Sequence, residues 1–257
     1  MTPRLDIQGY DFHCHVDLHQ DPAELIERCE AHRIVVLAVT TTPRAWPQNQ
    51  AWTTHSRYVH SSIGLHPELV HRYYEEISIL EARMDETRLV GEIGLDGSRR
   101  YRQSLNIQLE VFSRVVKRAS ELGGRVLSIH SRHAANQVLD TLSRYARKNT
   151  VLPILHWYSG SRSTASKALG NGCYFSINFR MLESESGQGL VEFLPSERLL
   201  VETDAPFTFT DNQKYDTTNP IKVADQIASL KGIPRGEFTS LLRQNATTVF
   251  GFADIEL

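Results

Sequence analysis

Two histidines separated by one residue, His13 and His15, lie in the segment DFHCHVD at positions 11–17. In a β-strand the side chains at i and i+2 share a face, so both imidazoles point one way while Phe12 and Cys14 point the other. Two imidazoles on one face at the end of a strand can chelate a metal ion. We therefore predict that His13 and His15 are metal ligands and that Cys14 is a core residue.

Four further groups that can bind a metal lie within short apolar runs or at their ends. Glu92 is a carboxylate within the apolar run VGEIGLD at 90–96, and burying it is costly without a metal or a cation. His130, His156 and Asp204 each end or directly follow a later run. Four imidazoles and two carboxylates suit two divalent ions, such as Mg, Mn, Zn or Fe, with one bridging carboxylate.

Weaker candidates stand beside these ligands, and each has an ordinary structural alternative. His66 can hydrogen-bond a substrate or cap a turn, and Arg132 can clamp a phosphate oxygen or simply be solvated. Trp157 and Tyr158 can stack on a nucleobase or pack in the core. Glu202 can orient a ligand histidine or form an internal ion pair.

The elements that position these residues follow a regular alternation of short apolar runs with segments in which apolar residues recur at steps of three and four. Such alternation predicts parallel strands and covering helices, and eight units in about 250 residues fit a (β/α)8 barrel of the α/β class. A doubly wound sheet is the alternative, although HCH stands where that fold usually has a glycine-rich turn. The predicted strands are 7–13, 34–40, 59–66, 89–95, 125–130, 151–156, 173–177 and 199–203.

The length of 257 residues, with 40% hydrophobic and 23% charged residues, predicts one compact domain spanning 1–257. One helix is expected at 102–122, ending at the Gly123-Gly124 pair, and another after Asp21-Pro22. The polar segment 207–219 follows the eighth strand, so we expect it to belong to the site.

Charge, hydropathy and cysteine content bear on which partners the protein can bind and on its cellular setting. The net charge of −2 provides no global basic field for nucleic acid, but two divalent ions, two carboxylates and a bridging hydroxide would leave about +1 at the site. The longest apolar run, 34–39, is far shorter than the roughly 20 residues of a membrane span. Three cysteines without CxxC spacing favour a reducing cytoplasmic setting.

Taken in order, DFHCHVD, GLHP at 64–67, GEIGLD at 91–96, HSR at 130–132, HWYSG at 156–160 and ETDAP at 202–206 closely resemble the TatD family of metal-dependent deoxyribonucleases. The resemblance covers nearly the whole chain. It implies a TIM barrel of the metal-dependent hydrolase superfamily and two metal positions. The first would be held by His13, His15, Glu92 and Asp204, and the second by Glu92, His130 and His156.

The chain departs from the family pattern near both ends. The segment after His15 is short, Thr40 to Thr42 precede Pro43, and Lys214 is the only basic residue of the 207–219 loop. The shortened start and the Thr-Pro stretch resemble the TatD-like nuclease of the Qat anti-phage defence system, which implies the other subunits of that system as partners.

We therefore expect a cytoplasmic metal-dependent phosphodiesterase that acts on DNA, at single-stranded or frayed ends, with Glu92 bridging the ions and Asp204 accepting a proton from water. One alternative is an amidohydrolase or deaminase that acts on a small molecule. Another is a defence-complex subunit that acts mainly by protein interaction. The sequence does not identify the metal, the direction of cleavage or the pathway, and it does not separate DNA from RNA as the substrate. It also leaves the oligomeric state open, although a monomer is compatible with it.

Overall fold

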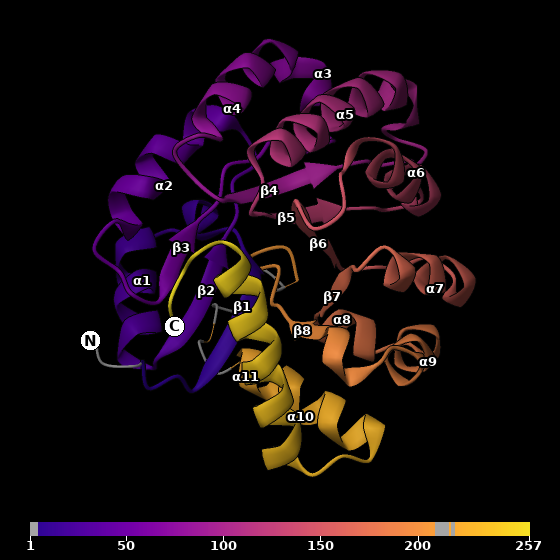
Figure 1. The fold of residues 1–257 in the computed structure, drawn as a ribbon. Coiled ribbons are helices and arrows are strands. Elements are labelled where there is room, and N and C mark those ends of the chain that lie inside the picture. The colour runs from indigo at the N-terminus through magenta and orange to yellow at the C-terminus, as the bar shows by residue number, and fades with distance from the viewer. Residues whose placement is uncertain (1–4, 209–215, 217–218) are drawn as a thin grey trace.

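The computed structural model describes residues 5–208, 216 and 219–257, and it contains a ring of eight parallel strands (Figure 1). Regular pairing gives two sheets, β1-β2-β3 and β4-β5-β6-β7-β8. Isolated bridges between Ile63 and Val90 and between Cys14 and Ala205 join these sheets at both edges and close the barrel. The strands are β1 Gly9–Cys14, β2 Ile34–Ala38, β3 Val59–Ser61, β4 Leu89–Gly94, β5 Arg125–His130, β6 Val151–His156, β7 Tyr174–Ile177 and β8 Leu199–Val201.

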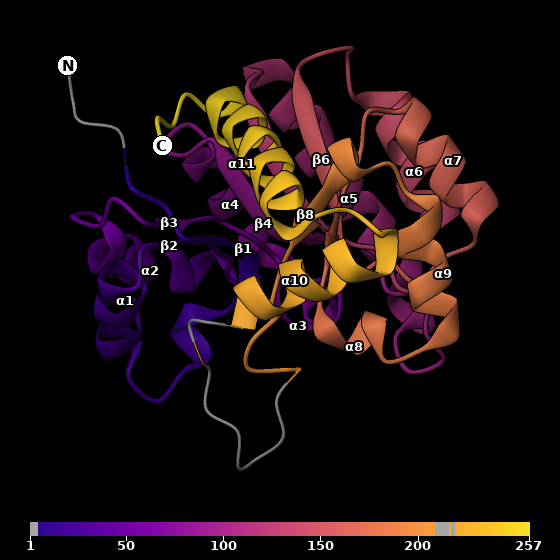
Figure 2. The same ribbon diagram turned by 90° about the horizontal axis from the view of Figure 1, so that it is seen from below.

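Helices surround the strands, and their ends follow local sequence signals (Figures 1 and 2). The Asp21 side chain accepts a hydrogen bond from the Glu24 N–H at the start of the first helix, with Pro22 at its first position. The fifth helix ends at Gly123, whose φ of 69° few other residues adopt. The helices are α1 Pro22–Ala31, α2 Trp46–Thr53, α3 Val70–Tyr73, α4 Ile77–Arg83, α5 Leu105–Leu122, α6 Ala135–Tyr145, α7 Arg162–Gly170, α8 Phe179–Leu182, α9 Glu185–Phe193, α10 Asn219–Lys231 and α11 Arg235–Phe252.

The two ends of the barrel differ. Figure 2 shows α11 on one side of the strands and α3 and α8, which follow the carboxyl ends of β3 and β7, on the opposite side. One apolar cluster extends from the strands to the surrounding helices and includes Phe12 and Phe250, whose rings lie 5.4 Å apart. The carboxyl ends of the strands are therefore left for the loops that carry the candidate ligands. Among the described residues, no helix is long and apolar enough to cross a membrane.

The imidazole of His60 on β3 makes the fold sensitive to acid. Its ring lies 5.3 Å from that of Phe250, and its buried Nε2 has no hydrogen-bond partner among the described residues. Burial lowers the pKa of His60 from 6.5 to about 4. As the pH falls through this window, the unfolded chain gains the proton before the folded chain does, so stability is lost between pH 6.5 and 4.

We predict that His60→Leu removes up to about 3 kcal/mol of this acid destabilisation. The measurement is the free energy of unfolding in urea at pH 7 and at pH 4.5, compared with His55→Leu, which changes an exposed histidine nearby. If both variants lose as much stability on acidification as the parent, His60 is not the cause.

Candidate metal centre

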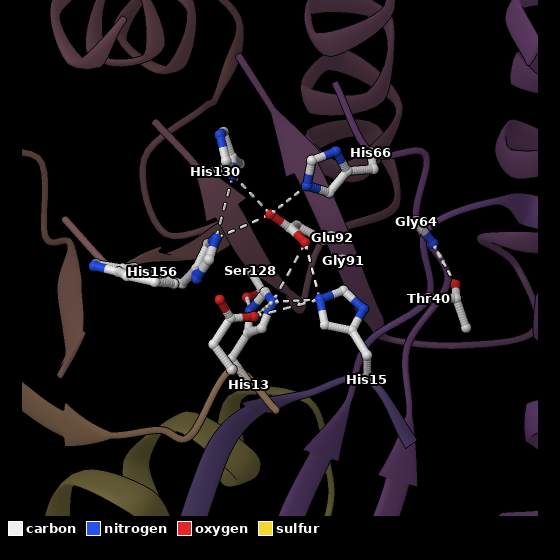
Figure 3. Close-up of polar contacts among 12 residues, drawn as sticks. His13, His15, Thr40, Gly64, His66, Gly91, Glu92, Ser128, His130 and His156 are labelled. Carbon is white, nitrogen blue, oxygen red and sulfur yellow. Dashed lines mark hydrogen bonds and ion pairs between the residues drawn. The ribbon is translucent and has the colours of Figure 1, made fainter. Parts of the chain in front are cut away.

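Two of the strands that carry candidate ligands deviate from regular pairing where those ligands lie. The register of β1 against β2 shifts between Asp11 and Cys14, and that of β4 against β5 shifts between Val90 and Ile93. A local shift of this kind changes the direction of the side chains beside it. His13 and Glu92 lie within the two shifted stretches, and both side chains point into the centre of the barrel end (Figure 3).

The carboxylate of Glu92 lies at the centre of the site, with imidazoles on several sides (Figure 3). Its Oε1 is 2.9 Å from His130 Nδ1, 2.9 Å from His156 Nε2 and 3.0 Å from His66 Nε2. Its Oε2 is 3.4 Å from His13 Nε2 and 3.3 Å from His15 Nε2. Each oxygen of this one carboxylate therefore faces a different set of histidines.

Asp204 approaches from the last strand of the ring. Its Oδ1 lies 3.6 Å from His13 Nε2 and 3.5 Å from His15 Nε2. Its backbone has a φ of 50°, and its N–H donates a hydrogen bond to the His13 carbonyl at 2.8 Å. The turn after β8 thus fixes Asp204 beside the end of β1.

Close backbone approach is required around Glu92. A side chain on Gly64 would place its Cβ 2.3 Å from the Glu92 amide nitrogen, and one on Gly94 would come within 2.1 Å of the His130 carbonyl oxygen. The Thr40 hydroxyl accepts a hydrogen bond from the Gly64 N–H at 3.0 Å (Figure 3). The glycines of the GLHP and GEIGLD motifs therefore allow β2, β3, β4 and β5 to meet at the site.

The structure brings the six predicted ligands together, and also places His66 against Glu92. Three groups of donor atoms lie within 4.8 Å of one another: His13, His156 and Asp204; His13, His15 and Glu92; and His66, Glu92 and His130. The sequence predicts His66 as a substrate contact or a turn cap, and its side chain, 14% exposed, is with His130 among the more exposed of these groups.

A carboxylate and a hydroxyl behind the histidines hold two of their rings. Asp96 Oδ2 lies 2.9 Å from His130 Nε2, and Ser128 Oγ lies 2.8 Å from His13 Nδ1. The sequence pattern predicts neither residue as part of the site. Their spacing in the sequence is the feature that could have identified them, since Ser128 lies two residues before His130 on β5 and Asp96 ends the GEIGLD motif.

Glu202 is wholly buried behind the later strands. Its Oε1 accepts hydrogen bonds from the Trp157 N–H at 3.0 Å and the Asn178 amide at 2.9 Å, and the Ser176 hydroxyl donates to its Oε2. Its distance of 3.6 Å from His156 Nδ1 is an ion-pair contact rather than a hydrogen bond. Glu202 therefore mainly holds the backbone and side chains around His156.

The four weaker substrate candidates occupy different environments. His66, Arg132 and Trp157 line the pocket above the ligands. Tyr158 does not, because only 1% of it is exposed, its ring packs edge-on against Phe175, and its hydroxyl donates to the Ser161 carbonyl. Stacking of Tyr158 on a nucleobase is therefore wrong, and Tyr158 is a core residue.

The electrostatics of the site favour ionised carboxylates. Burial disfavours the charge on Glu92, but the imidazoles of His66, His156 and His13 outweigh burial and hold its pKa well below the ordinary value. Burial likewise opposes charge on His15, but Asp204 and Glu92 raise its pKa to about 9. Burial and the neighbouring His156 lower the pKa of His13.

The donor set fits divalent metal ions. His13 Nε2 and His15 Nε2 lie 3.3 Å apart and both face Glu92 and Asp204, while His13 and His156 stack with ring centroids 3.8 Å apart. At most one member of such a close imidazole pair can donate to the other, whereas a cation accepts electron pairs from both. These buried His, Glu and Asp groups are able to bind metal.

A pocket of about 640 Å³ opens above the ligands. Its wall combines polar groups with Leu18, Leu69 and Phe207, and Phe207, 58% exposed, packs edge-on against His15. The loop 207–219 is predicted to belong to the site, and its first residue, Phe207, lies beside the ligand candidate His15. Lys214 lies outside the described residues.

Comparison with known proteins assigns the family. A family model described as "TatD related DNase" matches residues 10–251. The chain belongs to the TatD family. TatD relatives of known structure include a TatD homologue from Escherichia coli, which matches with a TM-score of 0.77 and 20% identity over 95% of this chain and 98% of that chain. The predicted α/β barrel is confirmed by the strand ring and by this shared fold.

Curated TatD relatives match over most of both chains. An uncharacterized metal-dependent hydrolase, YabD of Bacillus subtilis, is 28% identical, covering 94% of this chain and 98% of that protein. Human deoxyribonuclease TATDN3 is 27% identical, with 93% of each covered. A 3'-5' ssDNA/RNA exonuclease TatD of Erwinia amylovora is 26% identical, with 90% and 94% covered.

We predict that Glu92→Gln keeps the fold but lowers metal content and cuts hydrolysis by orders of magnitude, because glutamine loses the charge and one strong oxygen donor. Metal per chain is measured by elemental analysis beside the hydrolysis rate. Glu76→Gln is the matched control, since Glu76 is also buried but pairs with Arg44 away from the site. Parent-like metal content and rate in Glu92→Gln would contradict the central role of this carboxylate.

We also predict that Asp96→Ala weakens metal binding by about 10- to 100-fold and that Asp96→Asn weakens it less, because asparagine can still accept a hydrogen bond from His130. Contact with His130 and Ser98 outweighs burial and lowers the pKa of Asp96 to about 2, so its charge persists at neutral pH. Metal affinity is measured by competition with a chelator. Equal affinities in the parent and both variants would show that Asp96 does not position His130.

Proposed function

We propose that this TatD-family protein hydrolyses phosphodiester bonds at the ends of nucleic acids, with DNA as the main substrate. The proposal rests on the position of the two carboxylate oxygens of Glu92. One oxygen faces His13 and His15, and the other faces His130 and His156. A carboxylate with histidines on both sides is suited to bridge two divalent ions. The printed functions of the human and Erwinia relatives support nucleic acid as the substrate.

The ligand residues each have a role in this proposal. His13, His15, Glu92 and Asp204 would hold one ion, and Glu92, His130 and His156 would hold the other. Bound there, a pair of ions lowers the pKa of a water molecule and stabilises charge on phosphoryl oxygens. Asp204 lines the pocket with 4% of its surface exposed, so its carboxylate is placed to accept the proton of an attacking water.

The pocket wall provides contacts for a nucleotide. Arg132 can bind a phosphate oxygen through its guanidinium, and the half-buried ring of Trp157 can stack on a base. His66 Nε2 lies at the outer edge of the ligand group, where it can hydrogen-bond the substrate. Phe207 adds a further exposed aromatic surface beside His15.

A defence role is a further part of the proposal, and it rests on the resemblance of the shortened start and the Thr-Pro stretch to the Qat nuclease. Thr41, which belongs to that stretch, lines the pocket. We propose that the protein acts in the cytoplasm together with other subunits of such a system. Loss of phage protection in His13→Ala cells would tie that role to hydrolysis instead of to protein interaction alone.

We predict that linear single-stranded DNA is cleaved at least about tenfold faster than a closed circular duplex, because a flexible end enters a pocket at the end of a barrel more easily than the middle of a duplex does. End-labelled single-stranded, frayed and blunt DNA are digested with Mg²⁺, Mn²⁺ or Zn²⁺ and compared with the circular duplex. His13→Ala controls for a contaminating nuclease. Equal rates on the circle and the single strand would contradict action at ends.

The same experiment separates the proposal from its alternative. An amidohydrolase or deaminase would turn over small amides or nucleobases and leave every DNA substrate intact. The cleavage rate on a single-stranded RNA of the same sequence, measured in the same assay, shows whether the enzyme distinguishes ribose from deoxyribose. The lengths of the labelled products then give the direction of cleavage.

A further inference from the structure

Two loops beside the candidate metal centre, counted with the first turns of the helices that follow them, carry four arginines. The segment 97–109, which follows β4, contains Arg99, Arg100 and Arg102 and no acidic residue. The segment 131–139, which follows β5, contains Arg132 and no acidic residue. In a chain with a net charge of −2, these two loops therefore carry four positive charges and no negative one.

The side chains of these arginines are free to bind an external anion. All four are exposed. In residues 5–208, 216 and 219–257, none of them forms an ion pair, whereas eight arginines in other places pair with a carboxylate. The guanidinium of Arg100 lies over the ring of Tyr101, 5.3 Å from its centroid, which leaves its edge open to a partner.

The two loops are joined to each other and to the site. The Gly97 N–H donates to the Arg132 carbonyl at 2.8 Å, and the Ser98 N–H donates to Asp96 Oδ1 at 2.8 Å. The other oxygen of Asp96 lies 2.9 Å from the ligand candidate His130. Since Arg99 is three residues from Asp96, their Cα atoms are at most about 11 Å apart.

We propose that Arg99, Arg100, Arg102 and Arg132 form an arginine surface that binds the backbone phosphates of a polynucleotide next to the bond being cleaved. The inference rests on the proposed function. Guanidinium groups bind phosphate oxygens through two parallel hydrogen bonds, and a series of phosphates can engage several of them together. Arg132 lines the pocket and continues the surface to the ligands, whereas a small substrate would need only the pocket itself.

The arginine surface also resolves how an acidic protein holds a polyanion. A net charge of −2 gives no long-range attraction, so affinity must come from local contacts that displace counterions. Binding through such contacts weakens as salt rises, with a slope of about 0.7 per phosphate contact for single strands. The number of arginines in contact with the substrate is therefore measurable.

The test compares Arg99→Gln/Arg100→Gln with the control Arg144→Gln/Lys148→Gln in the metal-loaded enzyme. Arg144 and Lys148 are exposed. Arg144 lies in the last turn of α6 and Lys148 lies between α6 and β6, at the other end of the strands. Arg144 lies over the Tyr145 ring at 5.3 Å, the same arrangement as Arg100 over Tyr101. Each variant thus removes two positive charges, one of them stacked on the next residue.

The substrates are a labelled single-stranded DNA 20-mer and bis(p-nitrophenyl) phosphate, a phosphodiester without neighbouring phosphates. For Arg99→Gln/Arg100→Gln we expect KM for the 20-mer to rise about tenfold and the salt slope of log(kcat/KM) to fall by about 1.4. We expect kcat, and the rate on the small diester, to stay within about twofold of the parent. The control variant should match the parent on both substrates.

Three outcomes would overturn the inference. If the parent cleaves the 20-mer and Arg99→Gln/Arg100→Gln keeps its KM and salt slope, the arginine surface does not bind the substrate, although the proposed function stands. A similar loss in the control variant would also overturn it, because the effect would then come from overall charge. If the parent does not cleave the 20-mer with Mg²⁺, Mn²⁺ or Zn²⁺, the proposed function fails and the inference fails with it.

Discussion

The carboxylate of Glu92, a residue with only 1% of its surface exposed, keeps its charge because imidazole nitrogens face both of its oxygens. Without them, burial alone would raise its pKa and favour the neutral acid. The histidines come from the ends of β1, β5 and β6 and from the segment after β3, so this one group ties separate parts of the ring together. Removing its charge leaves those imidazoles facing one another, which is why the organisation of the site depends on it.

Much of the fold could be predicted from sequence because each strand is a short apolar run followed by a helical pattern. The bounds of β5 and β6 match the prediction at both ends. The third and eighth strands end earlier than predicted, at Ser61 and Val201. In both places the chain leaves the regular ladder to form an isolated bridge, from Ile63 to Val90 and from Ala205 to Cys14, and only the closed barrel supplies those partners.

The candidate ligands could be grouped from sequence because parallel strands place their carboxyl ends on one side of a barrel. Spacing does not reveal how the rings are held. The contacts of Asp96 with His130 and of Ser128 with His13 depend on neighbouring strands and side-chain rotamers. The sequence leaves open whether Tyr158 stacks on a base or packs in the core for a similar reason, since Trp157 and Tyr158 are adjacent and only the structure shows which of them turns inward.

The position of Asp96 links the metal centre to the loops around it. One of its oxygens accepts a hydrogen bond from the backbone of Ser98, and the other lies beside the ring of His130. The loop after β4 and a candidate ligand on β5 therefore share one buried carboxylate, so neither can shift without straining the contact of the other. Because Gly97 also binds the loop after β5, both loops are held to the same anchor. Such an arrangement fixes the backbone from which the exposed arginines extend relative to the buried donors.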